Sequence, residues 1–138
     1  MVTGLSLTTG YAIEALTCLA RHGCPSMRVG EIAEIADVPA AYLSKIFQRL
    51  CDAGIVESKR GYKGGVKLCR SPELISLLDI DEAVDAASSC PHANHAHKFS
   101  PKPQSFWFAF HKSYCEKLAS MTLAEVLSFE ASPSPVRL

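Results

Sequence analysis

Apolar residues recur at helical spacing in three successive stretches of the amino-terminal part of the chain. These stretches are residues 8–22, residues 31–36, and the residues from Pro39 to a stop at Gly54. The first ends at Gly23 before Pro25, and the second ends before Pro39, which is well placed as the first residue of the third. The pattern predicts three short helices in immediate succession.

After Gly54 the period of the apolar pattern changes to two. Residues 55–58 and 66–69 are typical of strands, and the segment 61–65 between them contains three glycines. This spacing predicts a glycine-rich β-hairpin.

Helical spacing returns in the second half of the chain. It covers residues 76–87, residues 105–120 and a short last helix that opens at Thr122. Ser76 with Asp79, and Thr122 with Glu125, have the spacing of capping boxes. Residues 88–104 hold three of the eight prolines and three of the five histidines, so we expect a loop there and a loose tail over 131–138.

Composition bounds the class of protein. The 138 residues are 48% hydrophobic, with 14 Lys+Arg against 14 Asp+Glu, as expected for one globular domain. Residues 1–70 hold nine Lys+Arg and six Asp+Glu (+3), whereas residues 71–138 hold five and eight (−3). Five of the basic residues fall in 59–70, which contains no acid, and such a strip favours a polyanionic partner.

Location and redox state follow from what the sequence lacks. No apolar run approaches the ~18 residues of a membrane span, and the opening residues lack the pattern of a secretory signal, so we expect a cytoplasmic protein with no membrane partner. The six cysteines form no C-x-x-C pair, and we expect reduced thiols. Of these, Cys18, Cys51 and Cys69 fall on apolar-periodic positions or strands and are expected in the core.

Three short helices followed at once by a glycine-tipped hairpin form the winged helix-turn-helix arrangement, in which the third helix enters the major groove and the hairpin, or wing, contacts the DNA backbone. On the third helix, Gln48 is suited to adenine, and Lys45 or Arg49 to guanine. Tyr42 or Ser44 can reach a phosphate or a thymine methyl, and the wing cations can neutralise phosphates. The predicted DNA-binding residues are Tyr42, Ser44, Lys45, Gln48, Arg49, Lys59, Arg60, Tyr62 and Lys63.

Several short stretches resemble one known family. They include Ala41-Tyr-Leu-Ser-Lys-Ile-Phe-Gln-Arg-Leu50, Arg60-Gly-Tyr-Lys-Gly-Gly65 and shorter pieces at 7–13, 31–34, 53–56, 77–80 and 122–125. In this order they resemble the Rrf-two type of bacterial winged-helix regulators, the group of IscR, NsrR and CymR. The resemblance covers most of the chain and implies a homodimeric transcription factor whose long carboxy-terminal helix crosses its twin, with a ligand-sensing loop just before it. Many relatives carry three cysteines for an iron–sulfur cluster in that loop, whereas this chain has only Cys90 there.

The helix predicted over 105–120 is unusually rich in aromatic residues. Phe106, Phe110, Tyr114 and Leu118 follow one line, and Trp107, Phe108 and Cys115 spread apolar surface around the helix. This apolar surface can be buried against a second copy of the chain or in the protein's own core. We predict a homodimer formed through this helix.

The loop 88–104 carries one thiol and three imidazoles within eight residues: Cys90, His92, His95 and His97. These groups suit a divalent metal or one corner of an iron–sulfur cluster with mixed ligands. Two other interpretations stay open, namely a direct response of Cys90 to oxidants and a plain polar loop that binds no cofactor.

The predicted fold is mainly α with a small β-hairpin. It comprises a winged helix-turn-helix DNA-binding domain over 1–75, the sensing loop and dimerisation helices over 76–130, and a tail over 131–138. The predicted function is a homodimeric, sequence-specific regulator of transcription that binds double-stranded DNA, with repression as the expected direction. The alternative is a winged-helix protein–protein interaction module that does not bind DNA. We do not expect an enzyme, because Cys90 and His92 lack recognisable oxyanion donors or an orienting group.

Overall fold

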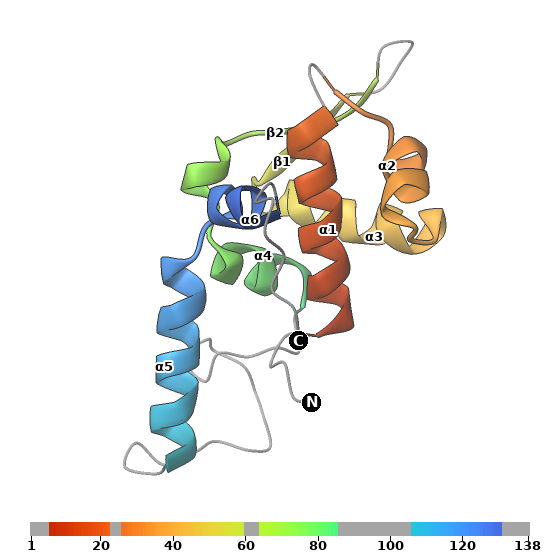
Figure 1. The fold of residues 1–138 in the computed structure, drawn as a ribbon. Helices are drawn as coiled ribbons and strands as arrows, with labels where there is room; N and C mark the ends of the chain where they lie inside the picture. Colours follow the sequence, from red (N-terminus) through yellow and green to blue (C-terminus); the bar gives the residue numbers. More distant parts are fainter. Residues whose placement is uncertain (1–5, 23–25, 60–63, 86–105, 131–138) are drawn as a thin grey trace.

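A computed structural model describes residues 6–22, 26–59, 64–85 and 106–130 of the chain. In order, the elements are α1 (Leu7–His22), α2 (Val29–Ala36), α3 (Ala40–Asp52), β1 (Val56–Lys59), β2 (Gly65–Leu68), the 3₁₀ helix η1 (Pro72–Leu74), α4 (Leu77–Val84), α5 (Phe106–Ser120) and α6 (Leu123–Glu130). The structure is mostly helical, with one two-stranded antiparallel sheet among the described residues (Figure 1). The predicted fold class is confirmed.

The predicted element boundaries hold to within about two residues, except at the end of α4. The sequence pattern placed this helix over 76–87, but α4 ends at Val84, and Asp85 caps it by donating its N–H to the Asp81 carbonyl at 2.9 Å. The predictions for 88–104 and 131–138 lie outside the described residues.

The turn between α2 and α3 is built from short-range preferences. Asp37 adopts a left-handed conformation with φ of 57°, which short polar side chains tolerate, and it ends α2. Pro39 follows as the cap of α3, where its missing N–H costs nothing. At the far end of α3, Gly54 takes φ of +76° and turns the chain into β1, as predicted for a stop signal.

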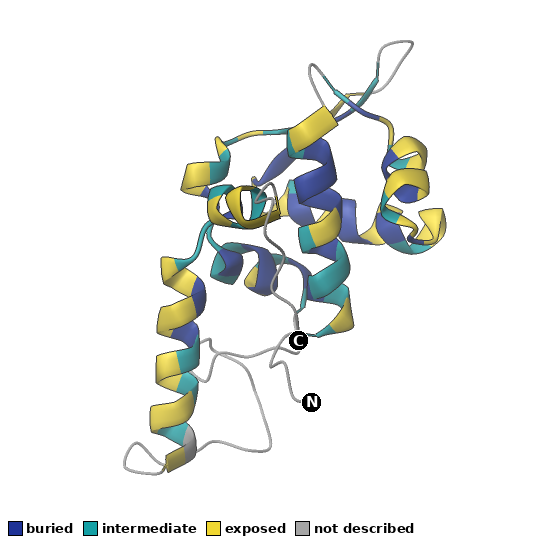
Figure 2. Ribbon diagram, in the orientation of Figure 1, coloured by how far each residue is buried: buried dark blue, intermediate teal, exposed yellow. Residues whose placement is uncertain are grey.

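The helices α1, α2, α3, α4 and α6 share one hydrophobic core. Its largest fully buried side chains include Leu16 of α1, Ile32 of α2, Leu43, Ile46 and Leu50 of α3, Ile80 and Val84 of α4, and Leu123 of α6. Figure 2 shows the buried positions of these helices where they face one another, and the residues on the other side of α3 are exposed. The amphipathic pattern of α3 therefore fixes which of its faces remains available.

The wing is held to the body by a third stretch of extended chain. β1 and β2 pair antiparallel, with Val56 opposite Leu68 and Lys59 opposite Gly65. Met27 bridges to Val66 through two backbone hydrogen bonds of 3.0 and 2.7 Å. The segment that precedes α2 thus anchors β2, a contact that the sequence pattern did not predict.

The carboxy-terminal helices return to the same core. Ser76 and Asp79 form the predicted capping box, with hydrogen bonds of 2.9 and 3.1 Å. The Ser76–Thr122 bridge and the bond from the Leu123 N–H to the Ile75 carbonyl (2.8 Å) then join the start of α6 to the start of α4. α5 extends past α4 to one side of the body (Figure 1).

The described cysteines differ from expectation at two positions. Cys18 is buried and Cys51 half-buried, but Cys69 is exposed, because it follows the end of β2. Cys18, Cys51 and Cys69 are free thiols. Cys115 of α5 is disulfide-bonded, so the expectation of a reduced thiol is wrong at this position.

No helix within the described ranges is long and apolar enough to cross a membrane.

Candidate DNA-binding surface

The exposed arc of α3 lies opposite its buried side, which is formed by Leu43, Ile46, Phe47 and Leu50. At about 3.6 residues per turn, Lys45 and Gln48 fall near the middle of this arc. Both residues are exposed, and neither forms a hydrogen bond or ion pair with another residue that the structure describes. Their side chains are therefore available to an incoming partner.

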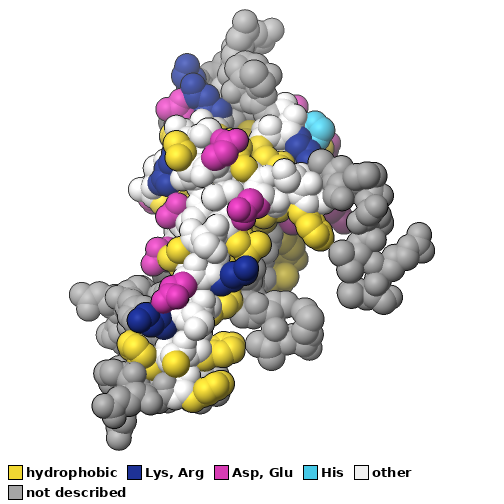
Figure 3. Space-filling view, turned by 60° about the vertical axis from the view of Figure 1, so that its left-hand side comes forward, with side chains coloured by type: hydrophobic (Ala, Val, Ile, Leu, Met, Phe, Trp, Pro, Cys, Tyr) yellow, Lys and Arg dark blue, Asp and Glu magenta, His cyan; other side chains and the backbone are white. Residues whose placement is uncertain are grey.

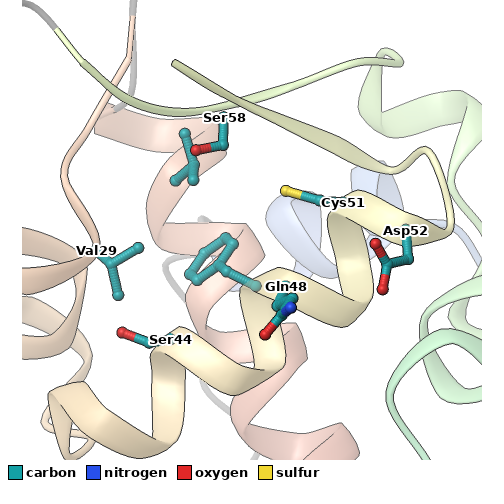
Figure 4. Close-up of a pocket in the computed structure, with 8 residues that line it drawn as sticks. Val29, Ser44, Gln48, Cys51, Asp52 and Ser58 are labelled. Atoms are coloured by element: carbon teal, nitrogen blue, oxygen red, sulfur yellow. The ribbon is translucent and has the colours of Figure 1, made fainter. Parts of the chain in front are cut away.

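A pocket of about 310 Å³ lies between α3 and the wing. A polar row on α3 lines one side of it, with Gln48 between Ser44 and Asp52 (Figure 4). Ser58 and Val66 of the wing line the opposite side. Ser44 donates its hydroxyl to the Ala40 carbonyl at 3.0 Å, within its own helix. Sequence reasoning missed Asp52, although its spacing of four residues from Gln48 places it on the same face.

Tyr42 lies at the edge of the arc rather than at its centre. Its hydroxyl is hydrogen-bonded to the Thr8 hydroxyl of α1. Its ring packs edge-to-face against Tyr11, with centroids 5.5 Å apart. The residue predicted to reach a phosphate is thus tied to α1.

Arg49 also lies at the edge of the arc, on the side of α4. Its Nη1 donates a hydrogen bond of 2.7 Å to the Val84 carbonyl at the end of α4. The role predicted for this guanidinium, recognition of guanine, would require it to leave that carbonyl.

The wing carries fewer unpaired cations than its sequence suggests. Lys59 is exposed at the end of β1, whereas Arg60, Tyr62 and Lys63 lie outside the described residues. Lys67 forms an ion pair of 2.8 Å with Glu57, directly opposite on β1, and Arg70 approaches Asp79 at 3.4 Å. The hydrogen bond between Lys67 and Glu57 lowers the pKa of the carboxyl and raises the pKa of the ammonium.

The Glu57–Lys67 pair had a sequence signal that the charge count overlooked. Once the hairpin register is fixed, residues 57 and 67 are cross-strand neighbours of opposite charge. Two of the five cations in the basic strip therefore have carboxylate partners, and they are less available to a polyanion.

The four candidate metal ligands, Cys90, His92, His95 and His97, lie outside the described residues. Across the ranges that are described, no group of three or more His, Cys, Asp or Glu side chains gathers in a way that could hold a metal ion.

A helix-turn-helix with an exposed arc on its second helix and a hairpin beside it is the arrangement of a winged-helix DNA-binding protein. The family described as "Rrf2: Iron-dependent Transcriptional regulator" matches residues 5–128. The chain belongs to the Rrf2 family. The family resemblance found in the sequence is confirmed, and the family consists of transcriptional regulators rather than enzymes.

Individual relatives agree with this assignment. An HTH-type transcriptional regulator of Synechocystis sp. is 32% identical over 129 residues, which cover 88% of this chain and 86% of that protein. The solved structure of T. potens IscR has a TM-score of 0.74 at 29% identity, covering 97% of this chain and 93% of that one. CymR of B. subtilis, described as the global cysteine regulator, has a TM-score of 0.74 at 25% identity, covering 94% and 98%.

Other curated relatives match only in part. Three of the first four matches span 52%, 49% and 59% of those proteins' length. These relatives and this Rrf2-family chain thus share the class of DNA-binding transcriptional regulator. The particular signal or process that an individual relative responds to or controls is a property of that relative.

Proposed function

We propose that this Rrf2-family protein is a cytoplasmic, homodimeric, sequence-specific repressor of transcription that reads DNA with α3 and the wing and senses a metal or redox signal through residues 88–104. The observation that carries the DNA-reading part is the exposed arc of α3 beside the hairpin. Lys45 and Gln48 present a cation and an amide there, the two side-chain types best suited to guanine and adenine edges.

The first test is DNA binding by the full chain. A duplex selected in vitro should be a near-palindrome with half-sites roughly 34 Å apart. With about six phosphates neutralised, log affinity against log salt should have a slope of about −5. Lys45→Ala and Gln48→Ala should relax the preference at particular base pairs, whereas Lys63→Ala should weaken binding to all sequences alike. A flat salt response, or no selected duplex, would favour the protein–protein module instead.

The proposal of a homodimer is supported by α5. Its carboxy-terminal half packs against the core through Tyr114, Cys115 and Leu118, but Phe106 and Phe110 are 74% and 53% exposed. Their rings lie one turn apart, with centroids separated by 6.0 Å. Figure 3 shows hydrophobic side chains gathered at the lower end of the view, where α5 begins. Two aromatic side chains on an extended helix are a suitable contact for a second copy.

Analytical ultracentrifugation tests this contact. The double variant Phe106→Glu/Phe110→Glu should sediment as a monomer and bind the palindromic duplex at least tenfold more weakly. Leu74→Glu is the matched control, because Leu74 is 68% exposed on η1, which packs against α6 at the opposite end of the body from the start of α5 (Figure 1), and should leave the dimer intact. A dimeric double variant would show that α5 is not the interface.

The sensing proposal depends on the donor set alone. One thiol and three imidazoles suit Fe²⁺ or Zn²⁺, or part of a cluster, and the family description names iron dependence. Protein purified without air should contain metal, and the triple variant His92→Ala/His95→Ala/His97→Ala should lose it. Metal analysis and a visible absorption spectrum measure this, and an unchanged metal content in the variant would refute it.

A further inference from the structure

Arg49 joins the helix expected to read DNA to the end of α4. Its guanidinium donates to the Val84 carbonyl at 2.7 Å, across 35 positions of sequence. Val84 is the last residue of α4, and its carbonyl belongs to the final turn, whose oxygens have no N–H partner within the helix. A cation at a helix carboxyl terminus also interacts favourably with the helix dipole.

The position of Arg49 on α3 separates it from the residues suited to base reading. All three residues are exposed, but Lys45 and Gln48 lie near the middle of the arc, whereas Arg49 lies at its edge and donates to the end of α4. A charge-assisted hydrogen bond to a carbonyl is strong and directional, so it restrains where α3 lies relative to α4.

We infer that Arg49 is a positioning residue for DNA binding. It holds α3 at the orientation in which Lys45 and Gln48 face the groove, and it does so by capping α4 rather than by touching DNA. The inference rests on the proposed DNA-reading function and adds how its reading helix is oriented.

The test compares two variants that each remove one cation from α3. Arg49→Met keeps the aliphatic stem and the helix propensity but loses the donor. Lys45→Met is the matched control, four residues earlier on the same helix. Affinity for the selected duplex and for single-base variants of it is measured by fluorescence anisotropy over a salt series, and backbone amide exchange by NMR in the free protein.

Arg49→Met should weaken binding about tenfold on every sequence, with the salt slope and the base preferences unchanged. In the free protein, the Asp85 amide, which bonds to the Asp81 carbonyl, should exchange about tenfold faster, while the Leu16 amide in the core helix α1 is unaffected. Lys45→Met should leave Asp85 exchange unchanged, and it should either shift the salt slope by about 0.9 or relax one base preference.

The inference is overturned if Arg49→Met leaves Asp85 exchange unchanged and instead shifts the salt slope or relaxes a single base preference, because Arg49 is then a DNA contact. If Arg49→Met does not fold, Arg49→Lys replaces it in the same measurements. It keeps the charge that a phosphate contact needs, so faster Asp85 exchange at an unchanged salt slope again supports positioning. Absence of DNA binding by the wild-type protein would refute the proposed function, whereas the exchange measurement still tests the Arg49 contact.

Discussion

Gly65, at the start of β2, is a position of the wing where one added methyl group would meet the backbone of another segment. Its φ is +153°, and a Cβ built there would lie 2.5 Å from the carbonyl oxygen of Met27 and 2.7 Å from its carbonyl carbon. Both are backbone atoms, so no side-chain rotation relieves the overlap. Two hydrogen bonds hold Met27 against Val66, the residue next to Gly65. Gly65→Ala must therefore separate these two segments.

The cost can be worked out from these contacts. A non-glycine residue held in a sparsely populated region of positive φ costs about 1–3 kcal/mol, and each of the two lost backbone hydrogen bonds contributes about 0.5–1.5 kcal/mol. Gly65→Ala should therefore lower the free energy of unfolding by about 2–6 kcal/mol. For a domain of this size that corresponds to a fall in Tm on the order of 10 °C, measured by circular dichroism.

Gly30→Ala is the control for this experiment. A Cβ at Gly30, in α2, meets nothing within 4 Å, and alanine is the better helix former. This variant should have a free energy of unfolding higher by up to about 1 kcal/mol. If Gly65→Ala unfolds at the wild-type temperature or above it, the Met27 contact does not hold the wing and the reasoning fails.

Three further substitutions test the interior and the wing. Thr9→Val removes the buried hydrogen bond of 2.8 Å from Thr9 Oγ1 to Asp81 Oδ1. The free energy of unfolding, measured in urea, should fall by about 1.5–3 kcal/mol, and an unchanged value would show that this bond is not stabilising. Burial raises the pKa of Tyr114, whose hydroxyl has no hydrogen-bond partner among the described residues, so Tyr114→Phe should raise the free energy of unfolding by up to about 1 kcal/mol, and a clear loss of stability would show that this hydroxyl is hydrogen-bonded. Glu57→Gln releases Lys67 on the wing and should strengthen DNA binding with a salt slope steeper by about 0.9, whereas an unchanged slope would place Lys67 away from phosphates.

Local pattern determined the elements of the winged helix. The burial of Leu43, Ile46 and Leu50 follows directly from helical spacing, and the Ser76–Asp79 capping box from two residues three apart. These features depend on neighbours within a few positions, so the sequence contains all the information that they need.

The local pattern could not show which of the candidate DNA-binding side chains are already hydrogen-bonded within the protein. Arg49 bonds to a carbonyl 35 positions away, and Tyr42 to a hydroxyl 34 positions away. Which residues occupy those places depends on how α1 and α4 pack against α3, and a periodic pattern does not specify partners. Ser44, Lys45, Gln48 and Arg49 all keep the exposure that the pattern predicted, but the side chains of Ser44 and Arg49 are hydrogen-bonded within the fold.

In α5, the helix rich in aromatic residues, local pattern and tertiary packing likewise decide different features. The sequence showed that α5 has more apolar surface than one face can bury, but not which rings remain outside. The packing of α5 along α4 covers Leu118 and leaves Phe106 and Phe110 exposed. The sequence by itself thus determined the α-helices and strands, and the buried face of a helix with one clear apolar side such as α3, because periodicity is a local property. The tertiary structure decided which charges are paired and which aromatic rings face outward, because those contacts join distant segments whose proximity exists only in the packed fold.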